Sequence, residues 1–107
     1  MTDHSMDANA PGLEDILPAQ DGFSLRVRVL NEQGLHARPA AKIAQEAQKY
    51  DCDIRLTSNG ATVDAKSILD ILTLAAGHGS EIELRAAGPM AREALSQLGA
   101  LIRNRCR

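Results

Sequence analysis

The heptapeptide GLHARPA at residues 34–40 places an imidazole, a guanidinium and a proline just ahead of an alanine-rich segment. A helix that begins there leaves its first N–H groups without intrahelical partners and carries partial positive charge. Ser, Thr, Asp or Asn usually caps such an end, and none of them stands between Gly34 and Pro39. The helix start at Ala37 and Pro39 is therefore a candidate seat for a phosphate group.

His36 and Arg38 add chemistry to this seat. The pKa of a free histidine lies near ~6.5, so a neutral, nucleophilic imidazole is available at physiological pH. An arginine fork suits phosphate oxygens, and Pro39 suits a first helical turn, where its missing N–H costs nothing. His36 could accept a phosphoryl group and pass it on. The residues alone leave a second interpretation open, in which His36 is an exposed loop residue without chemistry.

Ser67 begins a second segment of interest, SILDILTL. Asp70, three residues later, resembles the partner of Ser67 in a capping box, so the serine needs to be no more than a helix cap. The helix predicted from Ser67 contains more apolar residues than one buried stripe can use. This excess predicts either complete burial or an exposed apolar patch for a partner. The apolar residues are Ile68, Leu69, Ile71, Leu72 and Leu74.

The elements that must position these residues follow from hydrophobic periodicity. Strict alternation from Phe23 to Val29 predicts a strand, and three- and four-residue spacing after residue 36 predicts a helix that ends near Tyr50. The same patterns predict strands over 52–58, 61–65 and 80–87, with an Asn-Gly hairpin turn at 59–60, and helices over 66–76 and 90–102. We therefore expect an α+β open-faced β-sandwich, a four-stranded antiparallel sheet with three helices on one face, in the order β-α-β-β-α-β-α.

Charge divides the chain into two parts. Residues 1–22 contain five acidic residues and no Lys or Arg, and Pro11, Gly12 and Pro18 interrupt them. They predict an acidic, flexible N-terminal extension before a single domain over 23–107. That domain has nine acidic and twelve basic residues, so its net charge of +3 suits acidic partners.

Cysteine spacing and hydropathy argue against several classes of function. Cys52 and Cys106 form no CxxC or Cys/His spacing, so we expect neither a metal site nor a disulfide. The chain has no basic start followed by an apolar run and no apolar run of about 20 residues, which predicts a cytoplasmic protein without membrane insertion.

Two blocks, GLHARPA and DAKSILDILTLAAGHGSEIEL, together resemble the HPr family, the histidine-containing phosphocarrier proteins of the bacterial phosphoenolpyruvate-dependent sugar phosphotransferase system (PTS). The resemblance extends over about residues 23–102. It implies that enzyme I phosphorylates His36 at Nδ1, that sugar-specific enzyme II proteins (EIIA) remove the phosphoryl group, and that Arg38 assists. It also implies a carrier without a cofactor, loaded from phosphoenolpyruvate through enzyme I, and not an enzyme with turnover of its own.

The resemblance gives further roles to the segment that begins at Ser67. In many HPr proteins the matching serine is a regulatory site for an HPr kinase/phosphorylase. The residues matching Ile68, Leu69 and Leu72 point outward and dock against enzyme I and other partners, including regulatory proteins, whereas those matching Ile71 and Leu74 point inward. The family also implies a cytoplasmic monomer.

Other functions are compatible with some of the same features. A nitrogen-type carrier shares the histidine signature but works with a different enzyme I, and a regulatory HPr paralogue would act through Ser67 alone; the presence of His36 with Arg38 argues against the latter. An RNA-binding sheet shares the β-α-β-β-α-β order but stacks bases on aromatic residues. Here the strands contain only Phe23, on the face that we assign to the core, so we expect no nucleic-acid partner.

Overall fold

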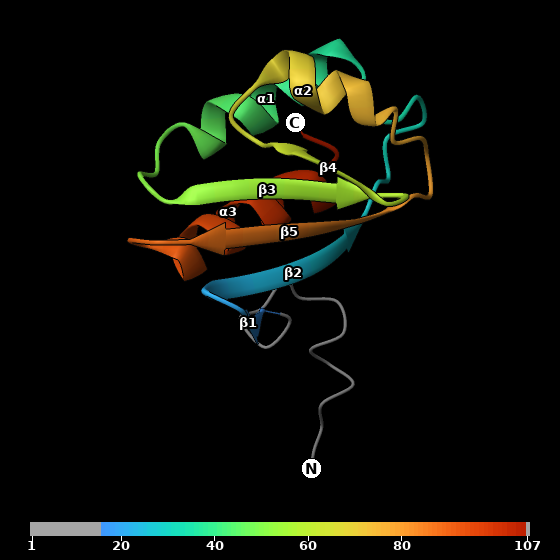
Figure 1. Cartoon of the computed structure of the whole chain (residues 1–107). Helices are drawn as coiled ribbons and strands as arrows, with labels where there is room; N and C mark the ends of the chain where they lie inside the picture. Colours follow the sequence, from blue (N-terminus) through green and yellow to red (C-terminus); the bar gives the residue numbers. More distant parts are fainter. Residues whose placement is uncertain (1–15, 107) are drawn as a thin grey trace.

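A computed structural model describes residues 16–106 of the chain. Five strands form one antiparallel sheet in the order β1-β2-β5-β3-β4, and three helices pack on it (Figure 1). The strands are β1 (Leu17–Ala19), β2 (Gly22–Arg28), β3 (Asp53–Ser58), β4 (Ala61–Asp64) and β5 (Glu81–Ala87). The helices are α1 (Ala37–Ala47), α2 (Ile68–Leu74) and α3 (Ala91–Arg103).

All three helices cover the same face of the sheet, and the other face is open (Figure 1). The strands alternate accordingly: on β2, Leu25 and Val27 are buried while Arg26 and Arg28 are exposed. β5 repeats this pattern with Ile82 and Leu84 inside. One apolar core therefore lies between the sheet and the helices, which confirms the predicted open-faced α+β sandwich.

The turns and helix ends agree closely with the sequence patterns. Asn59 and Gly60 adopt positive φ values of 53° and 84°, as the hairpin between β3 and β4 requires. α1 ends at Ala47, and turn residues continue to Tyr50. α2 is shorter than the predicted span of 66–76, because Ser67 is its N-cap and Ala75 leaves the helix in a left-handed conformation with φ 51°.

The predicted number of four strands is wrong, because residues 17–19 add β1 to the edge of the sheet. β1 pairs with the first residues of β2, Leu17 with Ser24 and Ala19 with Gly22. A tight turn at residues 20–21 joins them, and Ile16 is buried in the core. Residues 16–22, which we predicted to be flexible, thus belong to the fold, while residues 1–15 lie outside the described residues. Three residues that include a proline are too few to produce a readable alternation.

Candidate functional site

The loop before α1 is fixed against the segment that follows α2. The N–H of Leu35 donates to the carbonyl oxygen of Ala76 at 2.9 Å, and the Leu35 side chain is buried. Gly34 has φ 72°, and a Cβ at this position would collide with the carbonyl of Ala76. Glycine is therefore required here both for its backbone conformation and for the close approach of the two chains. This contact sets the position of the next residue, His36.

His36 occupies the N-cap position of α1. Its backbone is extended, and its carbonyl accepts the first hydrogen bond of the helix, from the N–H of Ala40 at 2.9 Å. No side chain caps the helix, as the sequence predicts, and no described group accepts a hydrogen bond from the N–H of Ala37 or Arg38. Both donors belong to exposed residues at the positive end of the helix. They can receive an anion, while Pro39 is buried in the first turn.

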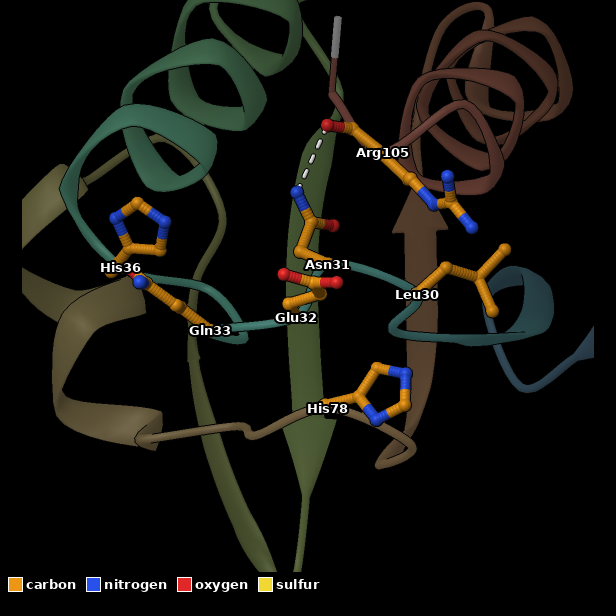
Figure 2. A pocket seen from close by; sticks show the side chains of 7 residues that line it. All are labelled: Leu30, Asn31, Glu32, Gln33, His36, His78 and Arg105. Carbon is orange, nitrogen blue, oxygen red and sulfur yellow. Dashed lines mark hydrogen bonds between the residues drawn. The ribbon is translucent and has the colours of Figure 1, made fainter.

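The His36 side chain is exposed between two hollows. The first has a volume of about 580 Å³ and lies toward the C-terminus of the chain (Figure 2). The second, of about 300 Å³, lies toward α2. The first is lined by Leu30, Asn31, Glu32, Gln33, His36, His78 and Arg105, and the second by Gln33, Leu35, His36, Leu72, Ala75, Ala76 and Gly77.

The two hollows show which predicted residues come together. Leu72 lies beside His36, because both line the hollow toward α2. Arg38 lines neither hollow and is exposed. Within residues 16–106 its guanidinium has no carboxylate partner and no hydrogen-bond acceptor. Arg38 is thus an uncompensated cation two residues from His36.

Ser67 caps α2. Its Oγ accepts a hydrogen bond from the N–H of Asp70 at 3.2 Å, as the sequence predicts. The return bond of a capping box does not form, since the Asp70 carboxylate accepts instead from the N–H of Asp64 at 3.4 Å. The Ser67 N–H donates to the carbonyl oxygen of Asp64 at 3.2 Å. The serine and both aspartates therefore form one local hydrogen-bonded turn at the helix start.

The apolar residues of α2 divide between two faces. Ile71 and Leu74 are buried in the core. Ile68, Leu69 and Leu72 are 39%, 75% and 36% exposed. Complete burial, the other interpretation of this segment, is therefore wrong. We call the three exposed residues the α2 patch. Leu72 of this patch lines the smaller hollow, between His36 and α2.

Sequence reasoning missed the six other residues that line the larger hollow beside His36, namely Leu30, Asn31, Glu32, Gln33, His78 and Arg105. Gln33 could have been suspected from its place three residues before His36. His78 stands between two glycines, a pattern typical of a surface turn, and the structure places it in an exposed turn. Arg105 arrives through the packing of α3, far along the chain, and no local pattern marks it.

The two cysteines of the chain lie in the core. Both cysteines are free and buried. Burial raises the pKa of the Cys106 thiol to about 11, and burial also raises the pKa of Cys52. Among residues 16–106 no group of three or more His, Cys, Asp or Glu side chains could hold a metal ion. In the same part of the chain, no helix has the length and hydropathy needed to span a membrane.

Comparison with known proteins gives consistent results. A family model described as the PTS HPr component phosphorylation site matches residues 23–104. The phosphocarrier protein HPr of Treponema pallidum is 48% identical over 79 residues, which cover 74% of this chain and 90% of that protein.

Solved structures agree with the sequence comparison. The structure of HPr-C-His from Thermoanaerobacter tengcongensis is similar with a TM-score of 0.75 and 35% identity, covering 78% of this chain and 93% of that one. Phosphocarrier protein HPr from Bacillus anthracis gives a TM-score of 0.71 and 46% identity, covering 74% and 94%. Sequence and fold similarity therefore extend over nearly the whole described domain.

Proposed function

Because the chain belongs to the HPr family of PTS phosphocarrier proteins, we propose that His36 is its phosphoryl acceptor and that the protein carries the group from enzyme I to EIIA proteins. The observation that supports this most is the placement of an exposed imidazole at an uncapped helix N-terminus. The free N–H groups of Ala37 and Arg38 lie next to it, so a phosphoryl group on His36 would meet hydrogen-bond donors and positive charge.

The transfer exchanges one bond to phosphorus for another. The lone pair of His36 Nδ1 attacks the phosphorus held by enzyme I, the bond from phosphorus to the donor group breaks, and the donor keeps the electron pair. The proton of the neutral imidazole is then on Nε2. Transfer to EIIA is the same exchange with His36 as the leaving group. Such transfers depend mainly on positioning and charge stabilisation, which the helix start and Arg38 supply.

The first experiment incubates the protein with phosphoenolpyruvate and enzyme I, of the sugar type and of the nitrogen type in parallel, and measures the intact mass. We expect one phosphoryl group on the wild type and on His78→Ala, and none on His36→Ala. His78 is a matched control, since it is also exposed and lines the same hollow. An adduct that persists in His36→Ala would exclude His36, and an unmodified wild type with both enzymes would exclude the carrier role.

Arg38 should act on the rate and not on the site of modification. Arg38→Ala removes a cation two residues from the acceptor, and we expect transfer to slow about tenfold or more. The phosphoryl group would still reside on His36. A rate equal to that of the wild type would refute the assistance assigned to Arg38.

The α2 patch is proposed as the docking surface for enzyme I and EIIA. Leu69 is 75% exposed, so Leu69→Ser should leave the fold intact and raise the KM for this protein as substrate of enzyme I. Leu17→Ser is the control, because Leu17 is 60% exposed on β1, outside the patch. Equal effects of both substitutions would refute a specific docking role.

Ser67 is proposed as a regulatory phosphorylation site. A phosphate on Oγ would be favoured by the N-terminus of α2 and disfavoured by the Asp70 carboxylate beside it. The test is incubation with ATP and an HPr kinase/phosphorylase, with Ser67→Ala as control. Modification of wild type and variant alike would exclude this serine.

A further inference from the structure

The chain turn that follows α3 holds an arginine where glycine is usual. The N–H of Arg105 donates to the carbonyl of Ile102 at 3.0 Å, and the N–H of Cys106 donates to that of Leu101 at 2.8 Å. These two bonds define a Schellman motif with Arg105 at the position that favours glycine. Arg105 and Cys106 both adopt left-handed conformations, with φ values of 59° and 57°. This left-handed conformation is energetically costly for residues other than glycine.

This turn is held beside the loop that carries His36. The Cys106 side chain is buried. The Asn31 Nδ2 group donates to the carbonyl oxygen of Arg105 at 2.9 Å (Figure 2). The Asn31 backbone carbonyl accepts from the N–H of Gly34. Asn31 therefore joins the C-terminal turn to the His36 loop. Arg105 is held in a specific place although its backbone conformation is unfavourable.

The Arg105 side chain lines the 580 Å³ hollow together with His36. Figure 2 shows the two side chains on opposite sides of Asn31 and Glu32. Within the described chain the Arg105 guanidinium makes no ion pair and donates no hydrogen bond. The titratable side chains around the hollow are Glu32, His36, His78 and Arg105. Arg105 is thus the permanent cation on this side of His36.

We propose that Arg105 is a specificity-determining residue that pairs with a carboxylate on the protein exchanging a phosphoryl group with His36. This inference rests on the proposed function. His36 lines both hollows. A partner that covers His36 therefore extends over the apolar α2 patch on one side and over the 580 Å³ hollow, which Arg105 lines, on the other. Charge complementarity selects an acidic group for the second contact, because an arginine fork without a partner matches a carboxylate. Asn31 acts as a positioning residue through the Arg105 carbonyl.

The central experiment measures steady-state phosphorylation by enzyme I for Arg105→Gly, Arg105→Lys and the wild type. Glycine suits the backbone at this position, so we expect the Tm of Arg105→Gly to rise by about 2 to 5 °C. Its KM should rise about three- to tenfold with kcat unchanged. Arg105→Lys should retain most of the affinity. Arg26→Gln removes the same charge from the open face of the sheet and should leave KM unaltered.

Ionic strength and neighbouring variants sharpen the test. The KM difference between wild type and Arg105→Gly should shrink at about 1 M salt, where screening acts over about 3 Å. Glu32→Gln should lower KM, because it removes a negative charge from the same hollow. Asn31→Ala should raise KM in the wild type but add nothing in Arg105→Gly.

Three results would overturn the proposal. Arg105→Gly could match the wild type in KM at low salt, or it could lower kcat and change the hydrolysis rate of the phosphorylated protein, which would place Arg105 on the phosphoryl group itself. A KM increase of equal size in Arg26→Gln would show an effect of net charge alone. If enzyme I fails to phosphorylate the wild type, the proposed function fails instead, so the two failures are distinguishable.

Discussion

Gly34→Ala should damage the His36 loop in two separable ways. An alanine at φ 72° carries the backbone cost of the left-handed conformation, about 1 kcal/mol. Its Cβ would also collide with the Ala76 carbonyl and lie 2.8 Å from the Cα of Gly77. Relieving this contact requires the loops to separate, which lengthens the buried hydrogen bond from Leu35 to Ala76. Leaving this buried donor and acceptor unpaired costs about 1 to 3 kcal/mol, so together with the backbone cost the total loss should be about 2 to 4 kcal/mol.

Gly60→Ala is the matched control. Gly60 has φ 84°, but nothing lies within 4 Å of a Cβ built there. The same substitution should therefore cost only the backbone part, about 1 kcal/mol. Equilibrium unfolding in urea gives both values, provided that the m-values stay equal.

The contact also makes a functional prediction. At a temperature where both variants are folded, His36 phosphorylation should slow in Gly34→Ala and stay unaltered in Gly60→Ala. Equal destabilisation by the two substitutions would refute the close approach of the loops as the reason for glycine at position 34.

Further predictions concern the cap, the edge strand, the buried thiol and a strained residue. Ser67→Ala should lower the free energy of unfolding by about 1 kcal/mol, measured by urea denaturation, through loss of the α2 cap. Ile16→Ala should lower it by about 2 to 4 kcal/mol, since Ile16 is buried beside β1. Folding raises the pKa of the Cys106 thiol to about 11. The free energy of unfolding should therefore not depend on this thiol below pH ~9, and should fall by up to about 2 to 3 kcal/mol as the pH rises from ~9 to about 11. Ala75→Gly should raise stability by up to about 1 kcal/mol, because Ala75 has φ 51°.

Each of these has an opposing outcome. If Ile16→Ala were as stable as the wild type, the sequence-based prediction of a flexible extension that continues through residue 22 would be supported. A stability loss above pH 9 that persists in Cys106→Ala would assign it to other groups. A Ser67→Ala variant as stable as the wild type would show that solvent replaces the cap. A destabilised Ala75→Gly would mean that the loss of the methyl group outweighs the relief of strain.

The parts of the fold that the sequence predicted are those encoded by local repetition. β2 and β5 alternate over seven residues each, and α3 repeats its apolar positions over thirteen. β1 escaped prediction because its stability comes from pairing with β2 and from burial of Ile16, and neither is visible in three residues.

The same distinction holds at the site. Helix caps are local, so both the missing cap at His36 and the Ser67 cap could be predicted. The exposure of the α2 patch to solvent could be inferred from the excess of apolar residues in this segment together with the family resemblance. His78 and Arg105 come from other parts of the chain and lie near His36 only through the packing of β2, β5 and α3. No spacing rule connects residues 36 and 105.

Three of the positions with positive φ lie in segments near His36. Gly34, Ala75 and Arg105 all have positive φ, and each lies in a segment that borders His36. Glycine removes the cost at position 34, where a side chain would block the approach of two loops. At positions 75 and 105 the cost is retained although glycine would remove it, and Arg105 differs from Ala75 in that it brings a charged side chain to its hollow. Retained strain of this kind is expected where a side chain has a role other than folding. If so, Ala75→Gly and Arg105→Gly should both stabilise the fold, and only the second should weaken the exchange with enzyme I.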